Sequence, residues 1–298
     1  MTINIDEVVQ RIPDWNGRQV SVSPLSGGLT NTNYRVEVDG QPYVVRLPGA
    51  NTELLAVDRA NEYHNTRAAA EAGTSPRILH YLAAERLMAL EFINGQTMNI
   101  AALQAPGMPG RMAQALRQLH AGPRFLTDFN MFRLVKFYLH IAGAHDVRIP
   151  DGYRDYGPSV ARIESALARH SLVAVPCHND LLAENYIDDG QGLWLIDFEY
   201  SGNNDPTFEL GNTCQEQQFD EPRQAEICAA YFGAADPDKL ARMKLQMIMS
   251  DVGWTLWAAI QAKTSTIEFD FWGWAVQRWD RARSKMDSIA FEAWLENA

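Results

Sequence analysis

Residues 177–185 read CHNDLLAEN, and residues 195–200 read LIDFEY. The first stretch has the spacing His-x-Asp-x-x-x-x-Asn, and the second places Asp-Phe-Glu directly after a short apolar run. Between them, residues 188–192 read DDGQG, which is typical of a tight turn between two strands. Either motif alone is common and usually marks a turn or an exposed strand end. Found together, in this order and this close, they indicate a single site.

The two motifs together contain the side chains that phosphoryl transfer requires. Asp180 is expected to lie beside an acceptor hydroxyl as the catalytic base. Asn185 and Asp197 would supply the oxygen ligands that Mg²⁺ prefers on the phosphates of a nucleoside triphosphate, so Asn185 serves both catalysis and metal binding. Glu199 would either reach a second metal ion or a metal-bound water, or act as a structural carboxylate after the metal strand.

Composition limits the classes of function that remain. The net charge of −11 argues against a surface for nucleic acid, which would need a basic patch. An acidic balance would tolerate a cationic substrate, although solubility explains it equally well. Three cysteines without a C-x-x-C pair indicate neither a disulfide framework nor a zinc site. The first residues do not resemble a secretory signal, and no apolar run is long enough to span a membrane, so we expect a cytoplasmic protein.

The periodicity predicts a β-rich first part and a mostly helical second part. Strands are expected within residues 20–47, among them 34–38 and 43–47 joined by the hairpin turn Asp39-Gly40, and at 88–93. The boundary is placed after the last strand, which divides the chain into 1–93 and 94–298, with a short sheet around 175–197. Helices are expected at 58–72, 109–121, 131–147, 158–170, 207–218, 222–232, 237–263 and 268–287.

These features resemble the choline/ethanolamine kinases, a branch of the protein-kinase-like fold that also contains the aminoglycoside phosphotransferases. The motifs that carry the resemblance are SGGLTN at 26–31, VVRL at 44–47, DFEYS at 197–201 with ELGN at 209–212, and WTLWAAIQAK at 254–263 with IEF at 267–269. The resemblance implies an α+β, bilobal fold, with a small β-rich N-lobe that binds the nucleotide and a larger, mostly helical C-lobe for catalysis and substrate binding.

The resemblance also implies a nucleotide site in the first lobe, with ATP and Mg²⁺ as cofactors. The small residues at 26–31 would approach the phosphates with their backbone, and Arg46 would hold the α- and β-phosphates with its bidentate fork. Glu62 is the candidate that orients Arg46, although Asp58 and Glu71 share its helix. The backbone at 91–93 would contact adenine, unless its side chains are plain core. The implied nucleotide-binding residues are Ser26, Gly27, Gly28, Asn31, Arg46, Glu62, Glu91 and Ile93.

The substrate end of the site is aromatic. Trp254 and Trp257 are spaced i, i+3 and therefore share one face of a helix, Trp274 lies on the next predicted helix, and Tyr200 follows the metal motif. A quaternary ammonium cannot donate N–H hydrogen bonds, so its recognition relies on aromatic faces and nearby carboxylates, for which Glu216 is the candidate. The alternative is that these tryptophans only fill the core.

Two residues depart from the family pattern, and several functions remain open. Leu182 stands where relatives often carry a polar residue, and Glu209 stands where the wider superfamily usually has Asp, so we expect Glu209 to brace the catalytic loop with a longer arm. The leading interpretation is an ATP-dependent choline kinase that forms phosphocholine. The alternatives are an ethanolamine or other small amino-alcohol kinase, an aminoglycoside-type phosphotransferase, and an inactive kinase fold that only binds a ligand.

Overall fold

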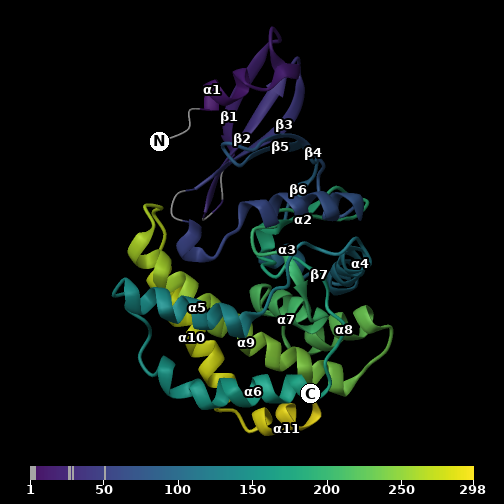
Figure 1. Cartoon of the computed structure of the whole chain (residues 1–298). Helices are drawn as coiled ribbons and strands as arrows, with labels where there is room; N and C mark the ends of the chain where they lie inside the picture. Colours follow the sequence, from purple (N-terminus) through teal and green to yellow (C-terminus); the bar gives the residue numbers. More distant parts are fainter. Residues whose placement is uncertain (1–4, 26–27, 29, 50–51) are drawn as a thin grey trace.

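The computed structural model describes residues 5–25, 28, 30–49 and 52–298, and its first part carries a five-stranded antiparallel sheet (Figure 1). The strands lie in the order β1-β2-β3-β5-β4, so the last two exchange places relative to the chain. Their bounds are β1 Val20–Leu25, β2 Asn31–Val38, β3 Gln41–Pro48, β4 Ile78–Leu82 and β5 Leu87–Glu91. One face of the sheet is covered by α1 (Ile5–Gln10) and the short helix η1 (Pro13–Trp15), which share a buried apolar cluster with it.

The β2–β3 hairpin confirms the predicted turn. Val38 pairs with Gln41, so only Asp39 and Gly40 form the loop, and both have positive φ, 50° and 82°. Two consecutive left-handed residues match the right-handed twist of the flanking strands, which is why Asp-Gly is favoured here. The turn fixes the register that places Arg46 opposite Asn33 on β2 and Met88 on β5.

Helix α2 (Arg59–Glu71) lies between the sheet and the helical part of the molecule (Figure 1). It begins where predicted, because the Asp58 carboxylate accepts hydrogen bonds from the backbone N–H groups of Ala60 and Asn61, at 2.9 and 3.2 Å. Several of its polar residues are buried, among them Glu62 at 1 % exposure. The buried charged side chains of α2 need partners of opposite charge, and these partners come from residues of the candidate site.

The second part is built around the long helix α9 (Pro237–Thr264), which packs against α5, α7, α10 and α11. Almost every residue of α9 from 241 to 261 is buried, as expected of a helix surrounded by other helices. The remaining helices are η2 Thr52–Leu55, α3 Ile100–Leu103, α4 Met108–His120, α5 Met131–Ala144, η3 Tyr153–Tyr156, α6 Gly157–Arg169, α7 Pro206–Glu216, α8 Glu221–Phe232, α10 Phe271–Met286 and α11 Ala290–Asn297.

Two small sheets carry the sequence motifs. Strand β7 (Val175–Cys177) pairs with β10 (Gly202–Asn204), and β8 (Tyr186–Asp188) pairs with β9 (Leu193–Leu195) and β6 (Gln96–Thr97). The loop that carries the first motif, residues 178–185, runs from β7 through the single turn η4 (Ala183–Asn185) into β8. No helix within the described ranges is both long and apolar enough to cross a membrane.

The predicted helices are confirmed, with differences at their ends. The helix expected at 268–287 begins only at Phe271, because the Asp270 carboxylate accepts the backbone N–H of Gly273 and caps it. The helix expected at 131–147 ends at Ala144. Helices α1, α3 and α11 and strand β4 were not predicted. The architecture agrees with the expected α+β arrangement, in which a β-rich part precedes a mostly helical part.

Candidate active site

Two cavities meet at the ends of the two sequence motifs. One, of about 460 Å³, lies between the sheet and the helical part and reaches from Arg46 and Glu62 to Glu91 and Ile93. The other, of about 400 Å³, lies within the helical part and contains Asp180. They share four lining residues, namely Gly28, Glu184, Asn185 and Asp197. A ligand in one cavity and a ligand in the other would therefore meet at this junction.

Side chains of α7 hold the loop that carries the first motif, residues 178–185, in place. The two carboxylate oxygens of Glu209 accept the backbone N–H groups of His178 and Asn179, each at 2.7 Å. One turn further along α7, Asn212 Oδ1 accepts the N–H of Leu181 at 2.7 Å. Glu209 is fully buried, so these charge-assisted bonds are not weakened by water. The predicted bracing role of Glu209 is confirmed.

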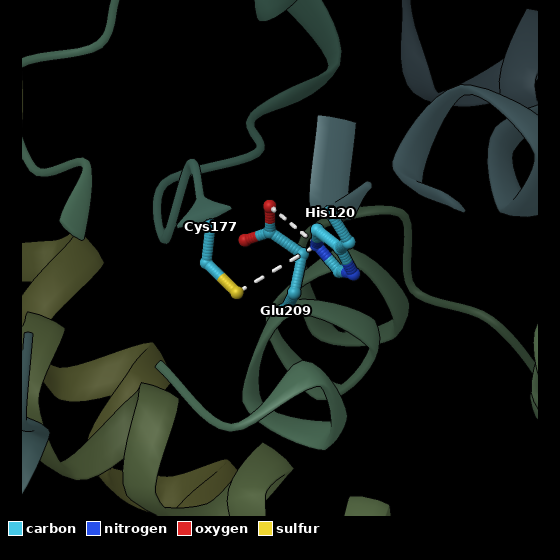
Figure 2. Close-up of side chains that lie close together, drawn as sticks. All are labelled: His120, Cys177 and Glu209. Carbon is cyan, nitrogen blue, oxygen red and sulfur yellow. Dashed lines mark hydrogen bonds and ion pairs between the residues drawn. The ribbon is translucent and has the colours of Figure 1, made fainter. Parts of the chain in front are cut away.

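Glu209 also belongs to a buried cluster that ties three elements together beneath the loop. Figure 2 shows it with His120 from α4 and Cys177 from β7, and His120 Nε2 lies 3.6 Å from both Cys177 Sγ and Glu209 Oε1. The other ring nitrogen of His120 contacts the Tyr231 hydroxyl at 2.6 Å. Burial raises the pKa of the Cys177 thiol well above its usual range. Because both Glu209 oxygens already accept backbone N–H groups, we interpret His120, Cys177 and Glu209 as a structural cluster that helps to hold the loop in place.

Asp180 lies within this loop and lines the cavity of about 400 Å³. Its backbone N–H donates to His178 Nδ1 at 3.3 Å, and His178 Nε2 contacts the carbonyl oxygen of Ile196 at 2.8 Å, which links the two motifs. The Asn185 amide donates to the Asp180 carbonyl at 2.8 Å. Burial raises the pKa of the Asp180 carboxyl well above its usual range, and the nearby carboxylates of Glu216 and Asp197 raise it further.

A charged cluster lies on the nucleotide side of the junction. The Arg46 guanidinium pairs with Asp197, and it also lies 3.2 Å from Glu62 Oε1 and 3.3 Å from Glu199 Oε1. Arg59, the first residue of α2, contacts Glu62 at 2.7 Å and Glu199 at 2.5 Å. The structure thus brings together the predicted residues Arg46, Glu62, Asp197 and Glu199. Of the three acidic candidates on α2, Glu62 is the one that contacts Arg46.

Glu199 is the most densely contacted carboxylate of this cluster. Besides the two arginines, it accepts hydrogen bonds from Thr30 Oγ1 at 2.6 Å and Asn31 Nδ2 at 2.5 Å. Burial alone would raise its pKa, but Arg46 and Arg59 outweigh burial and hold the pKa of Glu199 below its usual range. The contacts with residues 30 and 31 tie the start of β2 to the second motif, which supports the structural alternative for Glu199.

The rest of the nucleotide cavity involves the small-residue loop and the end of β5. Ser26 and Gly27 lie outside the described residues. Gly28 has φ of 97°, and a Cβ there would come within 2.8 Å of the Asn31 carbonyl oxygen, so this position requires glycine. Glu91 and Ile93 line the cavity; the Glu91 side chain pairs with Arg77, and the Glu91 backbone N–H donates to the Arg77 carbonyl oxygen at 2.9 Å.

The predicted aromatic residues also line the cavity that contains Asp180, which is called the acceptor cavity from here on. Tyr200, Trp254, Trp257 and Trp274 all line it. Trp254 stands edge-on to Tyr200 with ring centroids 4.9 Å apart, and Trp257 stands edge-on to Trp274 at 5.8 Å. The Trp257 indole N–H donates to the Tyr200 hydroxyl at 2.6 Å, which fixes both rings. The rings pack like core residues, yet they also form the wall of a cavity that opens toward Asp180.

Glu216 lines the same cavity, but it is bound by a residue that the sequence reasoning missed. Arg278 of α10 donates two hydrogen bonds to its carboxylate, at 2.6 and 2.7 Å. Arg278 follows Trp274 by four residues, so the helical i, i+4 spacing placed it beside a predicted site residue and could have identified it. Arg59 and Thr30 were missed as well, because their contacts with Glu199 cross more than 100 residues.

The residues at the junction suit Mg²⁺. Asn185 and Asp197 line both cavities, and Asn185 donates through Nδ2, which leaves its side-chain oxygen free to accept or to coordinate. Oxygen atoms of Glu62, Asp197 and Glu199 lie within 4.8 Å of one another. Their negative charge is met here by the Arg46 and Arg59 guanidinium groups. The oxygen donors of Asn185 and Asp197 are of the kind that a hard divalent ion prefers.

Comparison with known proteins identifies the class. Residues 21–245 match the phosphotransferase enzyme family. A choline/ethanolamine kinase family protein from Mesorhizobium loti is 35 % identical, with a TM-score of 0.86 and 98 % of each chain covered. Choline kinase LicA from Streptococcus pneumoniae is 25 % identical, with a TM-score of 0.80 over 95 % of this chain and 98 % of that one. Ethanolamine kinase 1 of Mus musculus is 29 % identical, with 90 % of this chain and 85 % of that protein covered.

The kinase-like fold and the paired motifs define a phosphotransferase that acts on an alcohol group. Within that class, the chain belongs to the choline/ethanolamine kinase family. The resemblance and the fold class predicted from the motifs are therefore confirmed. The family implies two ligands, a nucleotide and an amino alcohol, and the two cavities are the candidate sites for them.

Proposed function

We propose that this protein is an ATP-dependent choline kinase, which transfers the γ-phosphoryl group of ATP to the hydroxyl of choline to give phosphocholine. The observation that carries the proposal is the acceptor cavity, in which four aromatic rings line the same space as the half-buried Asp180. A trimethylammonium group has no N–H to donate, so the faces of Tyr200, Trp254, Trp257 and Trp274 are the groups that suit it.

In this proposal Asp180 acts on the acceptor. It accepts the proton of the choline hydroxyl, or orients the hydroxyl through it, as the phosphoryl group crosses the junction. The brace from Glu209 and Asn212 keeps the carboxylate in place, which matters because positioning supplies much of the rate. Leu182, where relatives often carry a polar residue, also lines the acceptor cavity and adds apolar surface there.

We propose that the cavity that contains Arg46 binds the nucleotide, as the resemblance of its motifs to those of related kinases implies. Arg46 would hold the α- and β-phosphates, with Glu62 orienting it, and the backbone at 91–93 would meet adenine. Asn185 and Asp197 would hold Mg²⁺, and Glu199 would stand behind them. When bound, Mg²⁺ supplies neutralisation of the phosphate charge.

Ethanolamine is the second candidate acceptor, because curated relatives that resemble this chain are named ethanolamine kinases. A primary ammonium prefers hydrogen bonds to carboxylates. In the acceptor cavity, however, the Glu216 carboxylate is already engaged on both oxygens by Arg278. The arrangement of the cavity therefore favours choline over ethanolamine.

A coupled ADP-release assay tests the proposal. The acceptors are choline, ethanolamine with one or two methyl groups, ethanolamine itself, thiamine and one aminoglycoside, each titrated at saturating ATP and Mg²⁺. We expect kcat/KM to fall as methyl groups are removed from choline. A preference for ethanolamine would establish the second candidate, and faster turnover of the aminoglycoside would contradict both.

A further inference from the structure

Both carboxylate oxygens of Glu216 are occupied by one residue within the protein as described. Arg278 Nη1 lies 2.6 Å from Oε1, and Nη2 lies 2.7 Å from Oε2, so one guanidinium covers both oxygens. Arg278 is 1 % exposed and Glu216 is 7 % exposed. A bidentate pair that is shielded from water is both geometrically specific and hard to displace.

Two further contacts hold the Arg278 guanidinium in that position. Its central carbon lies 4.1 Å from the centroid of the Trp274 ring. Its Nη1 lies 3.6 Å from Asp251 Oδ1, which is buried and also contacts Arg281 at 2.6 Å. The fork is therefore fixed between a carboxylate, an aromatic face and a second carboxylate. Arg278 cannot swing away from Glu216 without losing all three contacts.

We infer that Arg278 is a positioning residue that sets acceptor specificity, because it withholds the Glu216 carboxylate from the substrate's ammonium group. The inference rests on the proposed function and deepens it. Ethanolamine carries three N–H donors and would gain hydrogen bonds from a free carboxylate in this cavity, whereas choline carries none. With Glu216 bound to Arg278, the contact that favours ethanolamine is removed, and choline loses no hydrogen bond.

The ratio of two kcat/KM values isolates this effect from general damage to the site. The positive charge of Arg278 also acts on Asp180, where it opposes the rise in pKa caused by burial. Removing that charge changes the catalytic step for both acceptors alike. A freed Glu216 would likewise attract both cations, but only ethanolamine can form hydrogen bonds with it. The ratio of kcat/KM for ethanolamine to that for choline therefore reports the hydrogen bonds.

The test compares the full-length protein with Arg278→Met in the ADP-release assay. We expect the ethanolamine-to-choline ratio to rise about tenfold or more, which is the size of one hydrogen bond to a charged group. Arg242→Met is the matched control, because Arg242 is a buried arginine that pairs with Asp205 outside the acceptor cavity. Its ratio should stay at the wild-type value even if its melting temperature falls. A folded Arg278→Met protein with an unchanged ratio would overturn the inference.

A double variant covers the case in which Arg278→Met does not fold. Glu216→Leu with Arg278→Met replaces the buried pair by apolar residues, an exchange that proteins often tolerate. We expect its ethanolamine-to-choline ratio of kcat/KM to match that of the wild type, because neither protein offers ethanolamine a free carboxylate at position 216. A folded double variant whose ratio rises as expected for Arg278→Met would show that the rise does not come from Glu216, and would also overturn the inference. If the wild-type protein phosphorylates neither acceptor, the proposed function itself is wrong.

Discussion

Replacing Trp257 by Leu separates a cation-binding role of the aromatic residues from simple core packing. Trp257 is 5 % exposed, lies edge-on to Phe271 and Trp274 with centroids 5.9 and 5.8 Å away, and donates its N–H to Tyr200. Leu fills part of the same space but has no aromatic face. The loss of one desolvated cation–π contact should cost about 2 kcal/mol, or about thirtyfold in kcat/KM for choline. Ethanolamine should be affected less, because its ammonium can still donate hydrogen bonds.

Trp257→Phe is the control for the indole N–H. It keeps an aromatic face but removes the hydrogen bond to Tyr200, which should cost about 1 kcal/mol of stability, and it also removes part of the buried ring. We expect it to retain most of the choline activity that the leucine variant loses. The assay is ADP release with both acceptors, accompanied by thermal unfolding of each variant. Equal choline activity in a folded Trp257→Leu protein would refute the reasoning, and a large loss of melting temperature with equal effects on both acceptors would assign Trp257 to the core.

Three further perturbations test the junction, the brace and the buried acid. Asp197→Ala should raise the Mg²⁺ concentration needed for half-maximal activity, because it removes an anionic ligand; an unchanged Mg²⁺ titration would contradict the metal role. Glu209→Gln places an amide N–H against one of two backbone donors, so kcat should fall and the free energy of unfolding should drop by about 2 kcal/mol in a urea titration; a wild-type kcat would contradict the brace. Burial raises the pKa of Asp251 from 3.8 to about 6, although the positive charges of Arg281 and Arg278 act to lower it. Between these two pH values the folded protein therefore keeps a proton on Asp251 that the unfolded chain releases. The free energy of unfolding should fall as pH rises through this window, and Asp251→Asn should remove up to about 3 kcal/mol of that fall; parallel urea titrations of both proteins from pH 4 to 7 check it.

Local features of the fold could be predicted from the sequence. The Asp39-Gly40 turn needs two left-handed residues, and Asp58 caps the helix that follows it, so both follow from neighbouring residues. Strand β4 was missed because it lies at the edge of the sheet and has an irregular register between Ile78 and His80. The start of α10 was misplaced because the apolar residues before Asp270 continue the helical pattern, while the cap ends it.

The candidate site could be predicted as a set of residues but not as a network of charges. Asp180, Asn185 and Asp197 lie within one continuous motif region, and in the structure all three line the same cavity. The pairing of Glu216 with Arg278 spans 62 positions and depends on how α7 and α10 pack against α9. The number of carboxylates could be read from the sequence, whereas the partner of each depends on the packing.

The most direct test of the central claim is to identify the product by phosphorus NMR after incubation with ATP, Mg²⁺ and choline. The wild-type protein should convert choline to phosphocholine, and Asp180→Asn should not, although it should still bind the nucleotide with nearly unchanged affinity. Absence of phosphocholine with the wild-type protein, or its formation at the wild-type rate by Asp180→Asn, would contradict the account.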